Sequence, residues 1–178
     1  MRDGIALDIG SGPGLLSVAL ADKSKLFIIA LDADPAMSRI AKTTAAGSAG
    51  RVVPITGDVH CMPIRDGTVS LIVSRGSIYF WEDRARAFQE IERVLRPGGF
   101  AFVGGSFGTP ALRDEIFTEM RRRNPNWDSD VARWSKRATP DVFRRELAAS
   151  GVARARIREE EEGMWVEIKK DAISQHAR

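Results

Sequence analysis

The sequence predicts an α/β protein built on a parallel, doubly wound sheet. Short apolar runs of strand length alternate with segments of helical periodicity between residues 5 and 105, and the first run ends in a glycine-rich turn. Strands that alternate with helices along a chain pair in parallel and are covered by the helices on both faces. The chain has 178 residues, which suits one domain with its own hydrophobic core.

The elements follow one another at regular intervals. The predicted strands are residues 5–9, 26–31, 52–55, 69–74 and 100–105. A helix opens directly from the glycine turn, and a second begins at Pro35, behind Asp34, because Asp before Pro is a standard helix start. A third is predicted over residues 83–95, with Pro97-Gly98-Gly99 ending it before the fifth strand.

The alternation breaks after residue 105. Residues 107–138 carry Trp127, Trp134 and an arginine cluster, and they are predicted to be an insertion at the C-terminal edge of the sheet. A helix start at Thr139 then leads to a hairpin of residues 153–159 and 164–170, with an acidic turn over residues 159–162. We therefore expect residues 1–178 to form a single domain, with 107–138 as a lid-like insertion.

Composition excludes several classes of protein. Apolar residues make up 43% and charged residues 29%, as in an ordinary globular protein. Cys61 is the only cysteine, and the histidines are His60 and His176, so neither a disulfide framework nor a Cys/His metal site is expected. The longest apolar stretch, residues 26–31, is far short of a membrane span, and no signal peptide is predicted. These features favour a cytoplasmic protein.

The basic excess is local. Residues 113–145 contain nine Lys and Arg against six Asp and Glu, and the rest of the chain is balanced. The acidic residues lie among the arginines and dilute the patch, so a solvated helical face is favoured over a surface for nucleic acid.

The loop from Asp8 to Gly14 carries the strongest local signal. Its Gly-x-Gly-x-Gly spacing permits a tight turn and the close approach of a ligand, and the helix that follows offers free N–H groups. The dinucleotide fingerprint would need glycine at position 15, where this chain has Leu15. The Asp8 carboxylate would repel a pyrophosphate but attract the ammonium of S-adenosylmethionine. The alternative is that Asp8 only accepts hydrogen bonds from the amides of the loop.

Asp32 ends the second predicted strand, eighteen residues after Gly14. A carboxylate at this place can accept hydrogen bonds from both hydroxyls of a ribose. The position suits NAD as well as S-adenosylmethionine. The structural alternative is a helix cap, a role that Asp34 can fill equally well.

Four motifs in this order resemble the class I S-adenosylmethionine-dependent methyltransferases of the ubiquinone/menaquinone-biosynthesis-like type: LDIGSGPG, LDADPAM, GDVHCMPIRDGTVSLIVSRGS and EIERVLRPGG. The resemblance covers about residues 5–106. It implies a Rossmann-like mixed sheet of seven strands whose last strand is antiparallel, which the hairpin at 153–169 supplies. The first strand begins four residues after the start of the sequence, so we expect the usual N-terminal helix to be lacking.

The same resemblance implies a donor site for S-adenosylmethionine, with S-adenosylhomocysteine as the product. It assigns Asp8, Gly10, Ser11, Gly12 and Gly14 to the methionine moiety, Asp32 and Ala33 to the ribose, Asp58 and Val59 to the adenine, and Ser74 to the wall beside the sulfonium.

No residue is an evident general base. Methyl transfer from a sulfonium is a direct displacement, however, so alignment alone supplies much of the rate. Candidates for orienting or deprotonating an acceptor are His60, Arg75 and Tyr79, and each has a structural alternative as a solvated loop residue, an ion-pair partner or a core residue. The glycine loop at 104–108 is predicted to border the acceptor pocket.

These observations predict methyl transfer from S-adenosylmethionine to a small-molecule acceptor. The insertion would act as a lid, and Trp127 and Trp134 would favour an apolar or aromatic acceptor. Two alternatives stay open: a non-catalytic protein that binds S-adenosylmethionine, and an NAD-dependent oxidoreductase, which rests on Asp32 and the glycine loop. Apolar surface left uncovered beside the first helix favours a homodimer.

Overall fold

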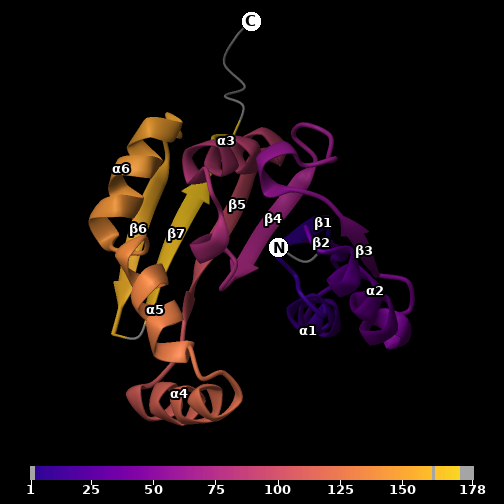
Figure 1. The fold of residues 1–178 in the computed structure, drawn as a ribbon. Helices are drawn as coiled ribbons and strands as arrows, with labels where there is room; N and C mark the ends of the chain where they lie inside the picture. Colours follow the sequence, from indigo (N-terminus) through magenta and orange to yellow (C-terminus); the bar gives the residue numbers. More distant parts are fainter. Residues whose placement is uncertain (1–2, 162, 173–178) are drawn as a thin grey trace, which may run out of the picture.

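A seven-stranded mixed sheet forms the centre of the computed structural model, which describes residues 3–161 and 163–172. Its strand order is β3-β2-β1-β4-β5-β7-β6, with β3 at the right and β6 at the left of Figure 1. The first five strands pair in parallel, and β7 is antiparallel to both of its neighbours. The strands are β1 (Ile5–Ile9), β2 (Phe27–Asp32), β3 (Val52–Thr56), β4 (Val69–Arg75), β5 (Leu95–Ser106), β6 (Ala155–Glu160) and β7 (Gly163–Lys169). The predicted Rossmann-like sheet is confirmed.

Six α-helices are present in the described residues, together with three short 3₁₀ turns. The helices are α1 (Leu15–Lys23), α2 (Pro35–Thr44), α3 (Arg84–Val94), α4 (Pro110–Arg123), α5 (Trp127–Lys136) and α6 (Pro140–Ser150). The 3₁₀ turns are η1 (Ala45–Gly47), η2 (Val59–Cys61) and η3 (Ile78–Phe80). Side chains cap four of the helices: Asp34, Asp83, Thr109 and Thr139 each accept a hydrogen bond from an amide of the first turn.

Two apolar clusters lie on opposite faces of the sheet. Successive side chains of a strand point to opposite faces, so Leu7 and Ile9 of β1 belong to the larger cluster and Ala6 to the smaller one. The larger cluster contains Phe88 and Ile91 of α3, together with Phe143 of α6. The smaller cluster contains residues of α1 and of the segment that leads into β3. Both faces of the parallel half of the sheet are thus covered, as such sheets require.

Two details differ from the prediction. β5 begins at Leu95, directly after α3, so Pro97-Gly98-Gly99 lies within the strand. The ladder with β4 shifts register between Val69 and Leu71, and Gly98 has a φ of 75°, so a bulge absorbs this glycine turn. The predicted acidic turn is shorter than expected, because Glu159 and Glu160 belong to β6; Glu162 lies outside the described residues.

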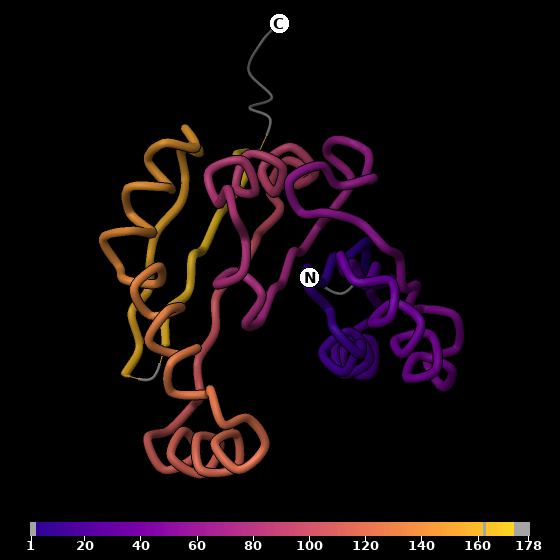
Figure 2. Tube along the Cα trace, in the orientation of Figure 1, coloured from indigo at the N-terminus to yellow at the C-terminus, as the bar shows by residue number. Residues whose placement is uncertain are grey.

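The segment between β5 and α6 forms α4 and α5. Figure 2 shows this part of the chain leaving the end of β5, turning through α4 at the far end of the molecule from α3, and returning to α6. No residue of either helix is buried. The segment is therefore attached to the sheet through few contacts, at the edge where the parallel strands end. No helix in the described part of the chain is long and apolar enough to cross a membrane.

Candidate functional site

The glycine loop joins the end of β1 to α1. The amides of Gly10 and Ser11 both donate to the Leu31 carbonyl, at 2.8 and 3.0 Å, which holds the loop against the end of β2. Gly10, Gly12 and Gly14 have φ values of 67°, 53° and 82°, a region that L-residues with a side chain rarely adopt. The sequence spacing therefore reflects a backbone conformation that only glycine adopts without strain.

The loop has open space above its backbone and carries one polar group without a hydrogen-bond partner among the described residues. A Cβ on Gly12 would meet no atom within 4 Å, so the space above the backbone is open. The Ser11 Oγ is buried and has no hydrogen-bond partner among the described residues. Because buried hydroxyls are almost always satisfied, this atom is suited to pair with a ligand lying on the loop.

Asp8 lies beneath the loop, at the end of β1. Its side chain is 1% exposed and accepts a hydrogen bond from the Ser17 hydroxyl at 2.6 Å. Burial raises the pKa of Asp8 to about 6, the Ser17 hydroxyl opposes this shift, and the nearby charge of Asp32 adds to it. Its partner is thus a residue in the first turn of α1 and not the loop itself. A buried carboxylate of this kind favours a cation in its neighbourhood.

Asp32 connects β2 to the same loop. Its two carboxylate oxygens accept from the Gly12 amide at 2.7 Å and from the Asp34 amide at 2.9 Å. Each oxygen can accept a further hydrogen bond, so the carboxylate can still bind a diol. The cap of α2 is Asp34, whose side chain accepts from the Ala36 amide at 2.7 Å. Ala33 lies between these two residues and is exposed.

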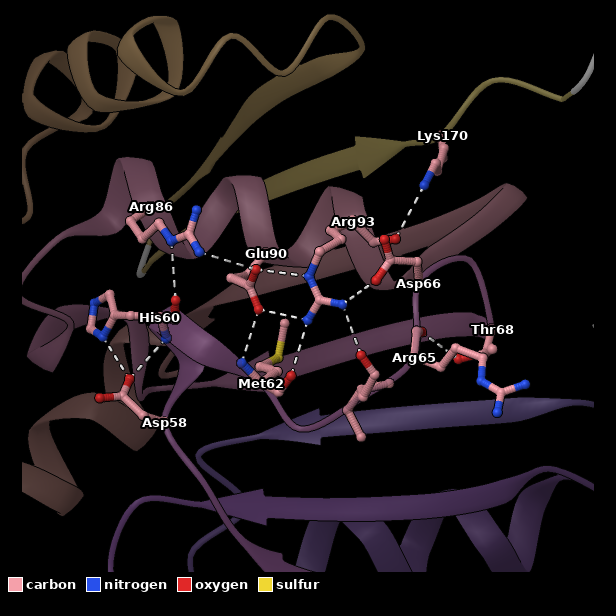
Figure 3. A network of polar contacts seen from close by, with 11 residues as sticks. Asp58, His60, Met62, Arg65, Asp66, Thr68, Arg86, Glu90, Arg93 and Lys170 are labelled. Carbon is pink, nitrogen blue, oxygen red and sulfur yellow. Dashed lines mark hydrogen bonds and ion pairs between the residues drawn. The ribbon is translucent and has the colours of Figure 1, made fainter.

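Asp58 and His60 form a pair at the end of β3 (Figure 3). Asp58 Oδ1 accepts from the His60 amide at 2.8 Å and lies 2.6 Å from His60 Nδ1. The backbone hydrogen bond from His60 is the main reason that the pKa of Asp58 is lowered. His60 Nε2 in turn accepts from the Asp83 amide at 3.2 Å, so both ring nitrogens are engaged. Val59, between these two residues in the chain, is buried in the larger apolar cluster.

Behind this pair, an ionic network around the buried Glu90 fixes the segment that carries Asp58 (Figure 3). Glu90 of α3 is 3% exposed and accepts from the Met62 amide at 2.9 Å. Arg93 binds both oxygens of Glu90, at 2.7 and 2.8 Å, and also donates to the carbonyls of Met62 and Ile64. No local pattern of residues indicates this network, because the contacts that join α3 to the Met62 segment span 28 to 31 residues of the sequence.

Ser74 and Ser77 connect β4 to β1. Their hydroxyls are 2.6 Å apart, and Ser77 Oγ donates to the Ile9 carbonyl at 3.0 Å. Since Ser77 gives its one proton to Ile9, Ser74 is the donor of the pair. The connection lies between neighbouring strands whose helices pass to opposite faces, which is the place where open α/β sheets bind ligands.

A cavity of about 740 Å³ opens beyond the ends of β4 and β5. Arg75, Tyr79 and residues 105–107 of the predicted glycine loop line it, whereas His60 does not. The Tyr79 hydroxyl donates to the Gly105 carbonyl at 3.3 Å, and burial raises the pKa of Tyr79. Of the three candidates for acting on an acceptor, the structure thus brings Arg75 and Tyr79 together and places His60 elsewhere.

Five aromatic rings that also line this cavity form a continuous chain, here called the aromatic wall: Phe80, Trp134, Trp127, Phe117 and Phe107. Successive centroids are 5.2, 5.9, 5.6 and 5.3 Å apart, and all four contacts are edge-to-face. Such contacts contribute about 0.5–1.5 kcal/mol each beyond the burial of area. The aromatic wall joins η3 to the end of β5 by way of α5 and α4.

The glycine loop and the cavity share a wall. Gly76 lines the cavity, and its neighbour Ser77 packs against Gly10. The fold and the site thus define a Rossmann-like ligand-binding domain, with a nucleotide-type loop on one side of the β4–α3 segment and a largely aromatic pocket on the other.

A sequence model described as a methyltransferase domain matches residues 7–103, which is more than half of the chain. The protein therefore belongs to the methyltransferase-domain family. A crystal structure of a candidate S-adenosyl-L-methionine-dependent methyltransferase from Methanococcus maripaludis is 41% identical. The similarity covers 98% of this chain and 81% of that one, with a TM-score of 0.85.

Curated relatives show similarity over most of this chain but over less of their own length. A malonyl-[acyl-carrier protein] O-methyltransferase of Geobacter sulfurreducens is 32% identical over 85% of this chain and 55% of that protein. A mitochondrial arginine-hydroxylase of Mus musculus is 33% identical over 61% of this chain and 30% of that protein. The chain spans about half, or less, of the length of these relatives. Similarity in this region is thus shared by proteins named for different reactions.

Proposed function

We propose that the chain transfers a methyl group from S-adenosylmethionine to a small-molecule acceptor held in the 740 Å³ cavity. The observation that carries this proposal is the shared wall, because Gly76 and Ser77 are consecutive residues that face the cavity and the glycine loop respectively. Two ligands bound on the two sides of one short segment lie close enough to react directly.

The residues around the glycine loop fit the methyl donor. The buried Asp8 carboxylate suits the ammonium of the methionine moiety, and the unpaired Ser11 hydroxyl can bind its carboxylate. Asp32 keeps acceptor capacity for the ribose hydroxyls, with Ala33 beside it. Asp58 and Val59 then face the adenine, and in this proposal His60 is a positioning residue that orients Asp58.

When bound, the donor supplies a methyl group on a positively charged sulfur, which leaves as a neutral thioether. The chain then has to align the acceptor with that methyl group and exclude water. Alignment of this kind is worth about 7–11 kcal/mol in well-oriented systems. Ser74 lies at the end of β4 beside the proposed sulfonium, and Arg75 and Tyr79 contact the acceptor.

Residues 107–138 act as a lid over the acceptor in this proposal. Trp127 and Trp134 of α5 line the cavity, yet neither α4 nor α5 has a buried residue. In this proposal the lid is held by the contact between the Phe80 and Trp134 rings and by Arg137. The Arg137 carbonyl accepts from Arg84 at 2.6 Å, and its guanidinium donates to the Trp81 carbonyl at 3.3 Å, so opening the lid breaks only a few contacts. An apolar or aromatic acceptor completes the enclosure.

Calorimetric titration with S-adenosylmethionine and S-adenosylhomocysteine tests the donor site. We expect both to bind, Asp32→Ala to lose binding, and Asp22→Ala, which alters an exposed carboxylate of α1, to keep it. NADH is titrated in parallel, because an NAD-dependent oxidoreductase would bind it instead. Binding of NADH alone, or of none of the three ligands, would overturn the proposal.

An acceptor panel then tests catalysis. It contains carboxylic acids, a malonyl thioester, phenols and amines, and the readout is the formation of S-adenosylhomocysteine. Turnover with a member of the panel supports a methyltransferase. Donor binding without turnover across the whole panel would instead favour a protein that binds S-adenosylmethionine without catalysis.

A further inference from the structure

Two polar groups of the cavity have no partner among the residues that the structure describes. The indole Nε1 of Trp127 is buried and makes no hydrogen bond. The guanidinium of Arg75, an exposed residue that follows Ser74 at the end of β4, makes no ion pair or hydrogen bond with a described residue. Both side chains line the same cavity.

The other polar side chains of the cavity either have a hydrogen-bond or ion-pair partner already or can both donate and accept, so they do not select for one kind of ligand atom. Tyr79 donates to the Gly105 carbonyl, and Ser106 Oγ accepts from the Gly108 amide. Glu159 pairs with Arg144, and Glu160 with Arg158 and the Trp165 indole. Ser135 is exposed and its hydroxyl can donate or accept.

The two unpaired groups have the same chemical character. An indole N–H and a guanidinium only donate hydrogen bonds, so a ligand that satisfies both must supply acceptor oxygens. The guanidinium also carries a permanent positive charge and presents donors in a fork that matches a carboxylate. The carboxylates at the rim, Glu159 and Glu160, already contact Arg144 and Arg158, which also pair with Asp141 and Glu167.

We infer that the acceptor of this enzyme is a carboxylate on an apolar body, bound through its oxygens by Arg75 and the Trp127 indole N–H. This inference rests on the proposed function and names the substrate class of the same site. The aromatic wall encloses the apolar body. In this inference the carboxylate lies beside Arg75, which precedes Gly76 of the cavity and Ser77, the residue that packs against the glycine loop.

A carboxylate acceptor also explains why the site needs no general base. A lone pair of the carboxylate oxygen forms the new O–CH₃ bond, while the C–S bond breaks and its electron pair stays on sulfur. The negative charge of the acceptor and the positive charge of the sulfonium cancel, so the products are a neutral ester and a neutral thioether. No proton is released at neutral pH, whereas methylation of a phenol or a protonated amine releases one.

The binding test compares matched acids and amides on the protein saturated with S-adenosylhomocysteine. The probes are 4-phenylbutanoate against 4-phenylbutanamide, and 2-naphthylacetate against 2-naphthylacetamide. We expect each acid to bind at least about tenfold more tightly than its amide, since hydrogen bonds to charged groups are the strong ones. Arg75→Gln should reduce this preference to about twofold or less. The control Arg96→Gln, at the opposite end of β5, should keep the preference.

The indole N–H is tested separately from the ring. Trp127→Phe keeps an aromatic ring but removes the donor, so it should weaken acid binding by about two- to tenfold. It should weaken amide binding less, because the neutral amide oxygen is the weaker acceptor. Trp127→Ala should weaken both. Acid binding that is unchanged in Trp127→Phe would mean that only the ring matters and would overturn the role of the N–H.

Proton release supplies a readout that binding does not. Turnover of an acid in weakly buffered indicator solution should form S-adenosylhomocysteine without acidification. Amides that bind as tightly as the acids, binding of neither probe, or a proton released in each turnover would overturn the carboxylate inference. Loss of S-adenosylhomocysteine binding itself would overturn the proposed function instead, so the two failures are distinguishable.

Discussion

Ser77 lies so close to Gly10 that a Cβ on residue 10 would come within 2.2 Å of the Ser77 Cβ. The Ser77 hydroxyl also donates to the carbonyl of Ile9, the residue before Gly10. The end of β1 and the segment that follows β4 are therefore in direct contact. Any side chain at position 10 must push the wall of the cavity away from the glycine loop.

Gly10→Ala should therefore destabilise the fold as well as the donor site. The new methyl group meets Ser77 and also forces alanine into a φ of 67°. We expect a loss of about 3 kcal/mol or more in the free energy of unfolding, since overpacking and positive-φ strain each cost about 1–3 kcal/mol. Urea denaturation measures it.

The matched variant is Gly12→Ala, where φ is 53° but the added Cβ meets no atom within 4 Å. Its free energy of unfolding should fall only by the cost of the backbone strain, about 1–2 kcal/mol. The added methyl group should still obstruct the donor. Equal stability losses in the two variants would show that the contact with Ser77 has no energetic consequence.

The pKa of Asp8 predicts how stability depends on pH. Its ordinary value of 3.8 is raised to about 6 by burial, so between these values the folded chain keeps a proton that the unfolded chain has released. The free energy of unfolding therefore falls as pH rises through this window, by on the order of 3 kcal/mol. Asp8→Asn, which cannot ionise, should be more stable than the parent chain at pH 7 and nearly equal to it below pH 4.

Chemical denaturation at pH 3.5 and pH 7 checks this difference, with the exposed Asp22→Asn as the control. The same substitution should weaken donor binding, because it removes the charge that faces the ammonium. A parent chain whose stability does not fall between pH 4 and pH 6, relative to Asp8→Asn, would contradict the raised pKa.

The number of protons released on donor binding gives an independent check of the raised pKa of Asp8. A cation placed near Asp8 favours its ionised form, so binding below pH 6 should release a proton and affinity should rise from pH 5 to pH 7. Titrations in buffers of different ionisation enthalpy count these protons. In Asp8→Asn the proton release should disappear; its persistence would assign it to another group.

The sheet and the glycine loop could be predicted because their signals are local. Strand-length apolar runs, Asp34 before Pro35 and the helix start at Thr139 depend on neighbouring residues only, and all appear in the structure. Asp8 and Asp32 follow from the same logic, since the ends of adjacent parallel strands must lie at one edge of the sheet. The register shift that draws Pro97 and Gly98 into β5 depends on pairing with β4, so a stop was predicted there instead.

The cavity could not be predicted in the same way. Phe107 and Phe117 meet through a turn and a helix that have no shared periodicity, and Phe80 reaches Trp134 from a distant part of the chain. His60 shows the opposite case, because a histidine suited to catalysis by type is held at both ring nitrogens by Asp58 and the Asp83 amide. The chemical type of a side chain could be predicted, but the hydrogen-bond partners that engage it could not.

Glu90 should be essential to the segment that carries Asp58. Arg93 holds the pKa of Glu90 below its usual range of about 4.5, so the stabilisation is complete at neutral pH and is lost as pH falls below that value. Glu90→Gln should lower the free energy of unfolding by about 1.5–3 kcal/mol at pH 7 and by much less at pH 3, because hydrogen bonds to charged groups are worth about that amount.

Thermal and urea denaturation at the two pH values measure this effect, and the exposed Glu82→Gln is its control. Donor affinity should also decrease in Glu90→Gln, since the Met62 amide and two carbonyls of the same segment depend on this ion pair. A loss of the same size at both pH values would mean that the shape of the side chain matters and its charge does not.

Removal of the Trp134 ring should impair the lid without affecting the donor site. It contacts both Phe80 and Trp127, so Trp134→Ala divides the aromatic wall, while Trp127→Ala removes the contacts with Phe117 and Trp134. Each variant loses two edge-to-face contacts, worth about 1–3 kcal/mol together. The value of kcat/KM for the acceptor should therefore fall by about tenfold or more, mainly through a higher KM, with donor affinity unchanged. Lys136→Ala, on the exposed surface of α5, should behave like the parent chain. Unchanged kinetics in both tryptophan variants would rule out a lid, and a parallel loss of donor affinity would place the aromatic wall in the donor site itself.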